Sequence, residues 1–414
     1  MNRQLAGVRA PALLGAAAVL WLCGSVHGAI TVRMVEDNFA ARIATLEASV
    51  PTWTAMDASE RITLQNKIID TITNAYNQPG MTWGFSWGGV IANAELIRFD
   101  AVPGPTDFGD APRVDWRNVK KDGSCNVYIP NFTPVLAAIN GQGMGVSRTQ
   151  RIEQLGTAMG LTAAHELGHN LGLDHRDCFG TSFITNANWA ATGGAQRKHI
   201  MSSGASGLPS GLERTVLRSF NEFELAKLGY AEDLVAAPPA SINETGANDA
   251  GNTLGAAKAI TFSTVATTNI LKACNIIGSI GVGDAEDWFK FTGAQNLLLT
   301  ADVLSSELLL DNRLADGTDT AMELWRDNAG APVMLFSNDD NRFNGTAFYS
   351  GTGEFSKDPF LLNFKLPATD TYYLKITRAQ APGSSYELFV TIPAPGVLGL
   401  LGLGTIVGAR RRRR

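Results

Sequence analysis

The eleven residues from His165 to His175, HELGHNLGLDH, constrain this chain of 414 residues more than any other feature. His165 and His169 are four residues apart, so on an α-helix their imidazoles share one face and lie about 6 Å apart. Gly172 can adopt the left-handed conformation that ends a helix, and the chain can then turn and bring His175 to the same point. Three imidazoles can hold one zinc ion and leave a fourth position open, which is typical of a catalytic zinc site. The stretch therefore predicts a helix that ends in such a site.

Glu166 follows the first histidine and lies beside the expected metal without binding it. A carboxylate next to an open coordination position suits a general base that acts on water. The alternative is that these histidines are solvated helix residues. Three of the five His in the chain fall in this one pattern, which favours the metal site.

HELGHNLGLDH resembles the signature of the metzincin zinc peptidases. The resemblance implies that the three histidines bind zinc and that Glu166 is the catalytic base. The clan also has a methionine turn beneath the metal, and the segment His199-Ile200-Met201-Ser202 follows at a plausible distance. By this resemblance Met201 is the floor of the metal site. Ordinary filling of the core is the alternative role for this side chain.

The chain departs from some metzincin subgroups. Ser203 stands where certain members have a tyrosine ligand two residues after the turn methionine, so we expect no tyrosine switch. Arg176 follows the third histidine, where other subgroups have Asp or Ser. The subgroup therefore stays open.

The N-terminus has the layout of a secretory signal peptide. Arg3 and Arg9 precede an apolar run over residues 10–23, and Val26-His27-Gly28 supplies small residues for cleavage. We expect residues 1–28 to be removed. A membrane anchor is the alternative, but the apolar run is short for a bilayer.

The C-terminal residues 393–414 resemble the PEP-CTERM sorting signal of Gram-negative bacteria. Pro-Ala-Pro is followed by an apolar, glycine-rich run over residues 396–409 and by five arginines at residues 410–414. The resemblance implies transient membrane association through the apolar helix, recognition by a sorting and processing enzyme, and a mature protein at the cell surface or secreted. Ala394 replaces the usual Glu, and a plain C-terminal anchor is the alternative.

The charge of the chain agrees with export. The formal net charge is −5, and the two ends hold seven Arg and no acidic residue, so removing them leaves a still more acidic protein. An acidic exported protein is not expected to bind nucleic acid.

Residues 29–235 predict a metallopeptidase domain of mixed α/β type. Residues 59–77 have helical periodicity, with Asp57 and Glu60 at capping-box spacing, and Ser59 is the alternative cap. The other expected elements are the active-site helix at 150–171, a closing helix at 214–228, and strands within 83–99 and 126–129. The glycine-rich segment 141–146 is either an edge strand for an extended peptide or a loop.

Residues 236–241 read as a linker because of their Ala and Pro content, and the pattern then changes. Short segments rich in β-branched and aromatic residues, separated by turn residues, predict a β-sandwich over residues 242–392. The expected strands lie at 288–291, 297–303, 322–325, 372–376 and 386–390. Segments 243–257 and 284–291 give this part a resemblance to the bacterial pre-peptidase C-terminal domain.

Four acidic residues of this second part could supply oxygen ligands to calcium, namely Asp284, Asp287, Asp339 and Asp340. Capping of turns is the alternative role for such residues.

Cys125, Cys178 and Cys274 remain after signal-peptide cleavage. Export permits disulfides, and a pair between Cys125 and Cys178 would hold the loop that leaves His175. Unpaired buried thiols are the alternative.

Together these features predict an α+β protein, with a metzincin-like domain (a twisted mixed sheet and a long active-site helix) followed by an all-β sandwich. The expected function is that of a secreted, monomeric zinc endopeptidase that cleaves a protein or peptide substrate. The alternative is a cell-surface or matrix-associated binding protein with a non-catalytic metal site.

Overall fold

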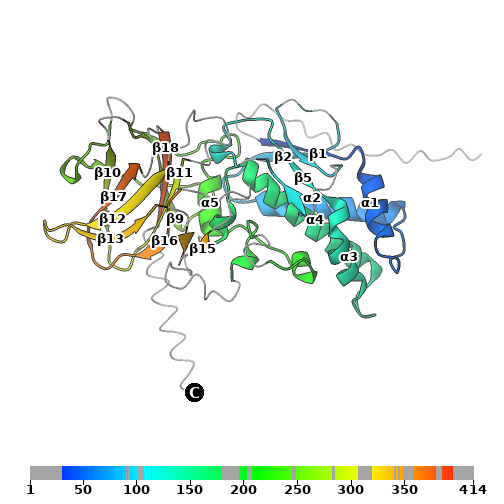
Figure 1. The fold of residues 1–414 in the computed structure, drawn as a ribbon. Coiled ribbons are helices and arrows are strands. Elements are labelled where there is room, and N and C mark those ends of the chain that lie inside the picture. Colours follow the sequence, from blue (N-terminus) through cyan, green and yellow to red (C-terminus); the bar gives the residue numbers. More distant parts are fainter. Residues whose placement is uncertain are drawn as a thin grey trace, which may run out of the picture.

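The computed structural model describes residues 30–394 except 90, 92, 101–106, 113, 180–194, 203–207, 245–248, 282–284, 306–318, 340–341, 344–345, 348–357 and 379–384. The predicted signal peptide and the sorting segment from residue 395 onward lie outside the described residues. Among the residues that are described, no helix is both long enough and apolar enough to cross a membrane. The chain forms a mixed α/β part followed by two packed β-sheets (Figure 1).

A five-stranded sheet forms the base of the α/β part, in the order β2-β1-β3-β5-β4. Its first four strands are parallel, and the edge strand β4 is antiparallel to β5. The strands are β1 (Ile30–Val35), β2 (Trp83–Trp87), β3 (Glu95–Arg98), β4 (Gly109–Asp110) and β5 (Ser124–Val127). The helices are α1 (Phe39–Ala48), α2 (Ala58–Tyr76), α3 (Thr133–Asn140), α4 (Arg148–Asn170) and α5 (Glu222–Leu228).

The two long helices begin where local capping predicts. Asp57 forms a capping box with Glu60 at the start of α2, as expected from the sequence, and Ser147 forms one with Gln150 at the start of α4. Two glycines of α4 then let the helices approach closely. A Cβ atom on Gly156 would lie 2.8 Å from the Lys67 Cβ, and one on Gly160 would lie 2.7 Å from the Thr71 Cβ. Helix α4 is consequently buried along most of its length, which fixes the position of its C-terminal end.

The closing helix expected at 214–228 is shorter than predicted. Helix α5 starts only at Glu222, because Asn221 caps it through a box with Glu224. The residues before it form a 3₁₀ turn, Leu212–Thr215, and the backbone of Val216 is extended. The apolar periodicity of the segment reflects burial of Phe220 and Phe223 and does not mark one continuous helix.

Segment 141–146 is a loop, so the interpretation as an edge strand was wrong. The antiparallel edge of the described sheet is β4, a two-residue strand that the sequence did not predict. So short a strand has no detectable period of alternating residues, which is why pattern analysis missed it.

The second part has two β-sheets that share one apolar core, a sandwich-like arrangement in agreement with the prediction. One sheet has the order β13-β12-β17-β10-β7, and the other has the order β16-β11-β18-β9-β6. A separate apolar core lies between them, with side chains from both sheets. All five expected strands are present, as β10 (Glu286–Gly293), β11 (Leu298–Leu304), β12 (Thr320–Arg326), β17 (Asp370–Arg378) and β18 (Ser385–Pro393). The remaining strands of these sheets are β6 (Ile242–Asn243), β7 (Lys258–Ala259), β8 (Ser263–Thr264), β9 (Leu271–Ser279), β13 (Val333–Asn338) and β16 (Phe360–Lys365).

The two parts share a buried interface on either side of α5 (Figure 1). Phe389 of β18 contacts Trp116, Phe223 and Tyr230, with ring centroids 5.2, 5.7 and 5.4 Å away. Packing is close enough that a Cβ atom on Gly229, at the end of α5, would overlap a Val265 methyl group. The apolar core of the first part therefore continues into the sandwich.

Cys125, Cys178 and Cys274 are all buried thiols. The predicted disulfide between Cys125 and Cys178 is not formed. Cys125 lies on β5, and burial raises its pKa well above the usual value, which keeps the thiol protonated and unreactive.

Candidate metal centre

Helix α4 presents His165 and His169 on one face of its last turns, and both are buried. The Nδ1 atom of His165 lies 2.8 Å from the carbonyl oxygen of Ile200, and that of His169 lies 2.7 Å from the carbonyl oxygen of Leu173. A carbonyl oxygen can only accept a hydrogen bond, so each Nδ1 carries the proton. Each Nε2 atom therefore has a lone pair available, which is the arrangement of metal-binding histidines with outer partners.

His175 reaches the same point after a reversal at Gly172. Gly172 has φ +94°, and the amides of Gly172 and Leu173 bond back to the carbonyl oxygens of His169 and Gly168. The Nε2 atom of His175 lies 2.9 Å from the Nε2 of His165 and 3.3 Å from that of His169. The structure thus brings together all three predicted ligands.

These separations fit a shared divalent ion. Three nitrogens at about 2.0–2.1 Å from one tetrahedral zinc lie about 3.3 Å from each other. Burial lowers the pKa of all three histidines. For His175 the charge of His169 adds to the effect of burial, and the pKa falls to about 3. The lowered pKa values favour neutral imidazoles, and the three side chains form a group that could hold one metal ion. Imidazole donors suit zinc and other transition metals better than calcium.

Glu166 is buried against β4, which is the last strand on that side of the described sheet. A Cβ atom on Gly109 of β4 would lie 2.8 Å from the Glu166 Oε1, so only glycine allows this approach. Burial raises the pKa of Glu166 well above its usual value, and the charges of Asp110 and Asp107 add to this shift. A carboxylate with a raised pKa is a stronger base than a solvated one, which suits the role of a general base.

Arg214 is a candidate site residue that the sequence did not single out. Its guanidinium lies over the Phe108 ring, 4.0 Å from the centroid, and its charge lowers the Glu166 pKa, partly opposing the effect of burial. The sequence placed Arg214 at the start of a helix. No local signal connects it with Glu166, which is far away along the chain.

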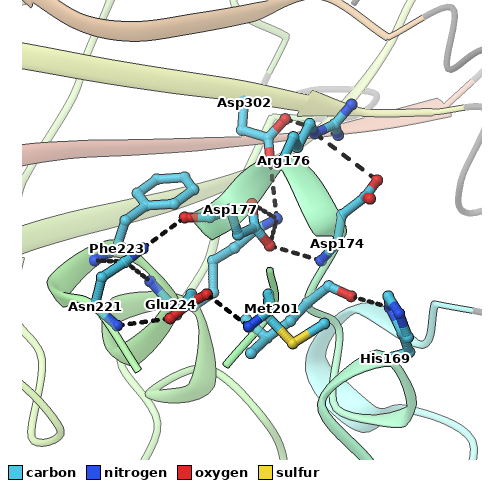
Figure 2. A network of polar contacts seen from close by, with 11 residues as sticks. His169, Asp174, Arg176, Asp177, Met201, Asn221, Phe223, Glu224 and Asp302 are labelled. Carbon is cyan, nitrogen blue, oxygen red and sulfur yellow. Dashed lines mark hydrogen bonds and ion pairs between the residues drawn. The ribbon is translucent and has the colours of Figure 1, made fainter. Parts of the chain in front are cut away.

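Met201 is fully buried under the helix turn that bears the histidines. A Cβ atom on Gly168 would lie 2.7 Å from the Met201 Sδ, so the helix and the methionine are in direct contact. The Met201 amide donates to Glu224 Oε1 at 3.2 Å, and its neighbour Ile200 accepts from His165. Figure 2 shows Met201 between Glu224 and His169. Ser203, two residues after Met201, lies outside the described residues.

Substituting Gly172 tests how much the site depends on the reversal before His175. In Gly172→Ala the methyl group would meet the Trp116 Cα at 2.8 Å, and alanine is strained at this positive φ. We expect the free energy of unfolding, measured in urea, to fall by about 1–3 kcal/mol. The control is Gly143→Ala, where a Cβ atom meets no heavy atom within 4 Å. An equal effect of both substitutions would contradict the expectation.

The acidic residues considered for calcium are only partly described. Asp284 and Asp340 lie outside the described residues, and Asp339 is exposed directly after the end of β13. Asp287 is buried and groups with Glu244 and Asp249, with oxygens within 4.8 Å of one another. Its Oδ2 accepts a hydrogen bond from the Tyr386 hydroxyl at 2.7 Å. Of the four predicted calcium ligands, Asp287 thus belongs to a carboxylate group that could hold a metal ion, and its geometry does not identify the ion.

Comparisons with known proteins add little to this geometry. No family model matches the chain, and no curated protein matches it. The pre-peptidase C-terminal domain of a collagenase from Bacillus anthracis is similar over 32% of this chain and 92% of its own, at 17% identity and a TM-score of 0.21. The Yersinia pseudotuberculosis-derived mitogen is similar over 29% of this chain and 84% of its own, at 15% identity and a TM-score of 0.19. Both likenesses are distant, and no argument about function rests on them.

Proposed function

We propose that the protein is an exported zinc endopeptidase of the metzincin type. The observation that carries the proposal is the convergence of three imidazole Nε2 atoms, two of them from helix α4, where a buried glutamate follows the first histidine. A purely structural zinc site is usually closed by four protein ligands and needs no unligated carboxylate next to it. The three histidines and Glu166 instead have the composition of a catalytic site.

His165, His169 and His175 would hold the zinc ion, which supplies Lewis acidity toward water and the substrate carbonyl group when bound. Glu166 then takes a proton from the attacking water, which its raised pKa favours, and passes this proton to the more basic leaving amine. The hydrogen bonds from each Nδ1 to a backbone carbonyl keep the first two rings in orientation throughout. This division of roles is peptide-bond hydrolysis by general-base catalysis.

The edge of the sheet gives the substrate a place to bind. Strand β4 pairs with β5 on one side and lies beside Glu166. An extended peptide that pairs with the other side of β4 would pass the glutamate with its backbone carbonyls held by strand-like hydrogen bonds. We propose this edge, and not segment 141–146, as the binding site of the peptide.

The ends of the chain belong to the same proposal. Residues 1–28 would direct export, and residues 393–414 would bring the protein to a sorting and processing enzyme at the membrane of a Gram-negative bacterium. The mature protein is then secreted or held at the cell surface, where protein substrates are accessible. The rival proposal is a surface or matrix-associated binding protein that uses its β-sandwich and has a non-catalytic metal site.

Zymography of the exported protein separates the two proposals. We expect clearing of a protein substrate that a chelator abolishes and that added Zn²⁺ restores, because the three histidines act only while they hold the ion. The chelator-treated protein is its own control for expression and loading. Absence of proteolysis in protein that contains one metal ion per chain would favour the binding protein.

A further inference from the structure

A cluster of buried charges lies directly behind the third histidine. Asp174, Arg176, Asp177, Lys227 and Asp302 each have a relative exposure of 0%. Three of them flank His175 in the chain, Lys227 comes from α5, and Asp302 comes from β11 of the sandwich. Figure 2 shows Asp302 reaching from its strand toward Arg176 and the turn below it.

Asp302 joins the two cations of this cluster. Its Oδ1 lies 2.9 Å from the Arg176 Nη2, and its Oδ2 lies 2.8 Å from the Lys227 Nζ. Lys227 also bonds both carboxylate oxygens of Asp177, at 3.0 and 2.9 Å. One side chain of the sandwich is thereby connected to two residues of the turn that contains His175.

The same turn is held from within. The Asp174 amide donates to the Asp177 Oδ2 at 2.7 Å, which closes the backbone around His175. Charges removed from water are stable only when each is compensated, so the loss of one partner disturbs all the others. The backbone around His175 is therefore tied within the turn by Asp174 and Asp177 and, through Arg176 and Lys227, to Asp302 of the sandwich.

From these contacts we propose that Asp302 is a positioning residue for the metal site. It acts through Arg176 and Lys227, which fix the turn that delivers His175. The β-sandwich is accordingly a structural part of the metal-binding unit and not only an appended module. The inference rests on the proposed function, because it assumes that the three histidines bind a metal ion.

A matched control comes from a second carboxylate of the sandwich. Glu387 on β18 pairs with Arg117 at 2.8 Å and accepts from the Trp116 Nε1 at 2.8 Å. It crosses the same interface, but its partners Trp116 and Arg117 lie against Gly172, at the start of the reversal, and not against residues 174–177. Glu387→Gln removes the charge and keeps an oxygen that can accept the Trp116 hydrogen bond. Asp302→Asn likewise removes one charge and keeps the size of the side chain.

The test is a titration of the metal-free full chain with Co²⁺, followed by visible absorption and by competition with a chromogenic chelator. We expect Asp302→Asn to weaken Co²⁺ binding by roughly 10–100-fold and to alter the absorption bands, as loss of an outer partner of a ligand does. Glu387→Gln should lower the urea midpoint of the metal-free protein and weaken Co²⁺ binding much less than Asp302→Asn does, because its partners contact the reversal only at Gly172. Wild-type affinity in Asp302→Asn, or equal weakening in both variants, overturns the proposal.

If Asp302→Asn does not fold, the double variant Asp302→Asn/Lys227→Met replaces it, since it removes one anion and one cation together. Its Co²⁺ affinity should be reduced as in the single variant, because Arg176 has lost its anchor on the sandwich. Unchanged affinity in this double variant contradicts the role of Asp302. If the wild-type chain binds no Co²⁺, the proposed function and this inference are both wrong. If the wild-type chain binds Co²⁺ and the loss of the Asp302 carboxylate does not change the affinity, only this inference is wrong.

Discussion

Replacing Glu166 with Gln is expected to abolish peptide hydrolysis while the protein stays folded and keeps its metal ion. Glutamine has nearly the same shape but cannot take a proton from water. Loss of a general base commonly costs about 10²–10⁴-fold in rate, which here should appear in kcat. The carboxylate is buried with a raised pKa, so a neutral amide is tolerated there, and we expect an unfolding midpoint equal to or above that of the wild type.

The control for this substitution lies on the same helix. Glu153 is an exposed residue of α4, and Glu153→Gln should leave both turnover and metal content unchanged. Peptide-cleavage kinetics, zinc content and thermal unfolding of the two variants give the comparison. Undiminished turnover in Glu166→Gln refutes the mechanism, and loss of zinc in that variant would assign Glu166 to metal binding.

The parts of the site that the sequence predicted are those encoded over a few residues. Two histidines at a separation of four share a helix face, and a glycine that can take a positive φ allows the reversal to His175. The capping residues Asp57 and Ser147 act within three positions of themselves, so helix starts are also local. The identity of the ligand residues, the helix and the reversal therefore follow from neighbouring residues alone.

What the sequence could not supply depends on distant parts of the chain. Asp302 lies far beyond Arg176 along the chain, and an acidic residue in a strand has no local mark that distinguishes an ion pair from a solvated position. The same holds for Arg214 beside Glu166. The strand next to the site, Gly109–Asp110, is too short for periodicity to reveal. The interface between the two parts was missed for this reason, although a mixed α/β part and a sandwich-like β part were both expected.

Removing the third imidazole should eliminate metal binding altogether. His175→Ala leaves two histidines on α4, and two ligands do not hold zinc against competing chelators. We expect the affinity to fall by more than the roughly 100-fold that loss of an outer partner costs, and hydrolysis to disappear with the metal. Zinc at about 1,000 times its dissociation constant stabilises a protein by about 4 kcal/mol, so the wild-type unfolding midpoint should rise with zinc and that of the variant should not.

His199 provides the comparison for this variant, because it is a partly buried histidine outside the group formed by the other three. His199→Ala should retain one zinc per chain and the zinc-dependent rise in the unfolding midpoint. Metal analysis by mass spectrometry and thermal scans with and without zinc measure both quantities. Full zinc content in His175→Ala would mean that the ion is held elsewhere, and the catalytic site derived from the convergence of His165, His169 and His175 would then be wrong.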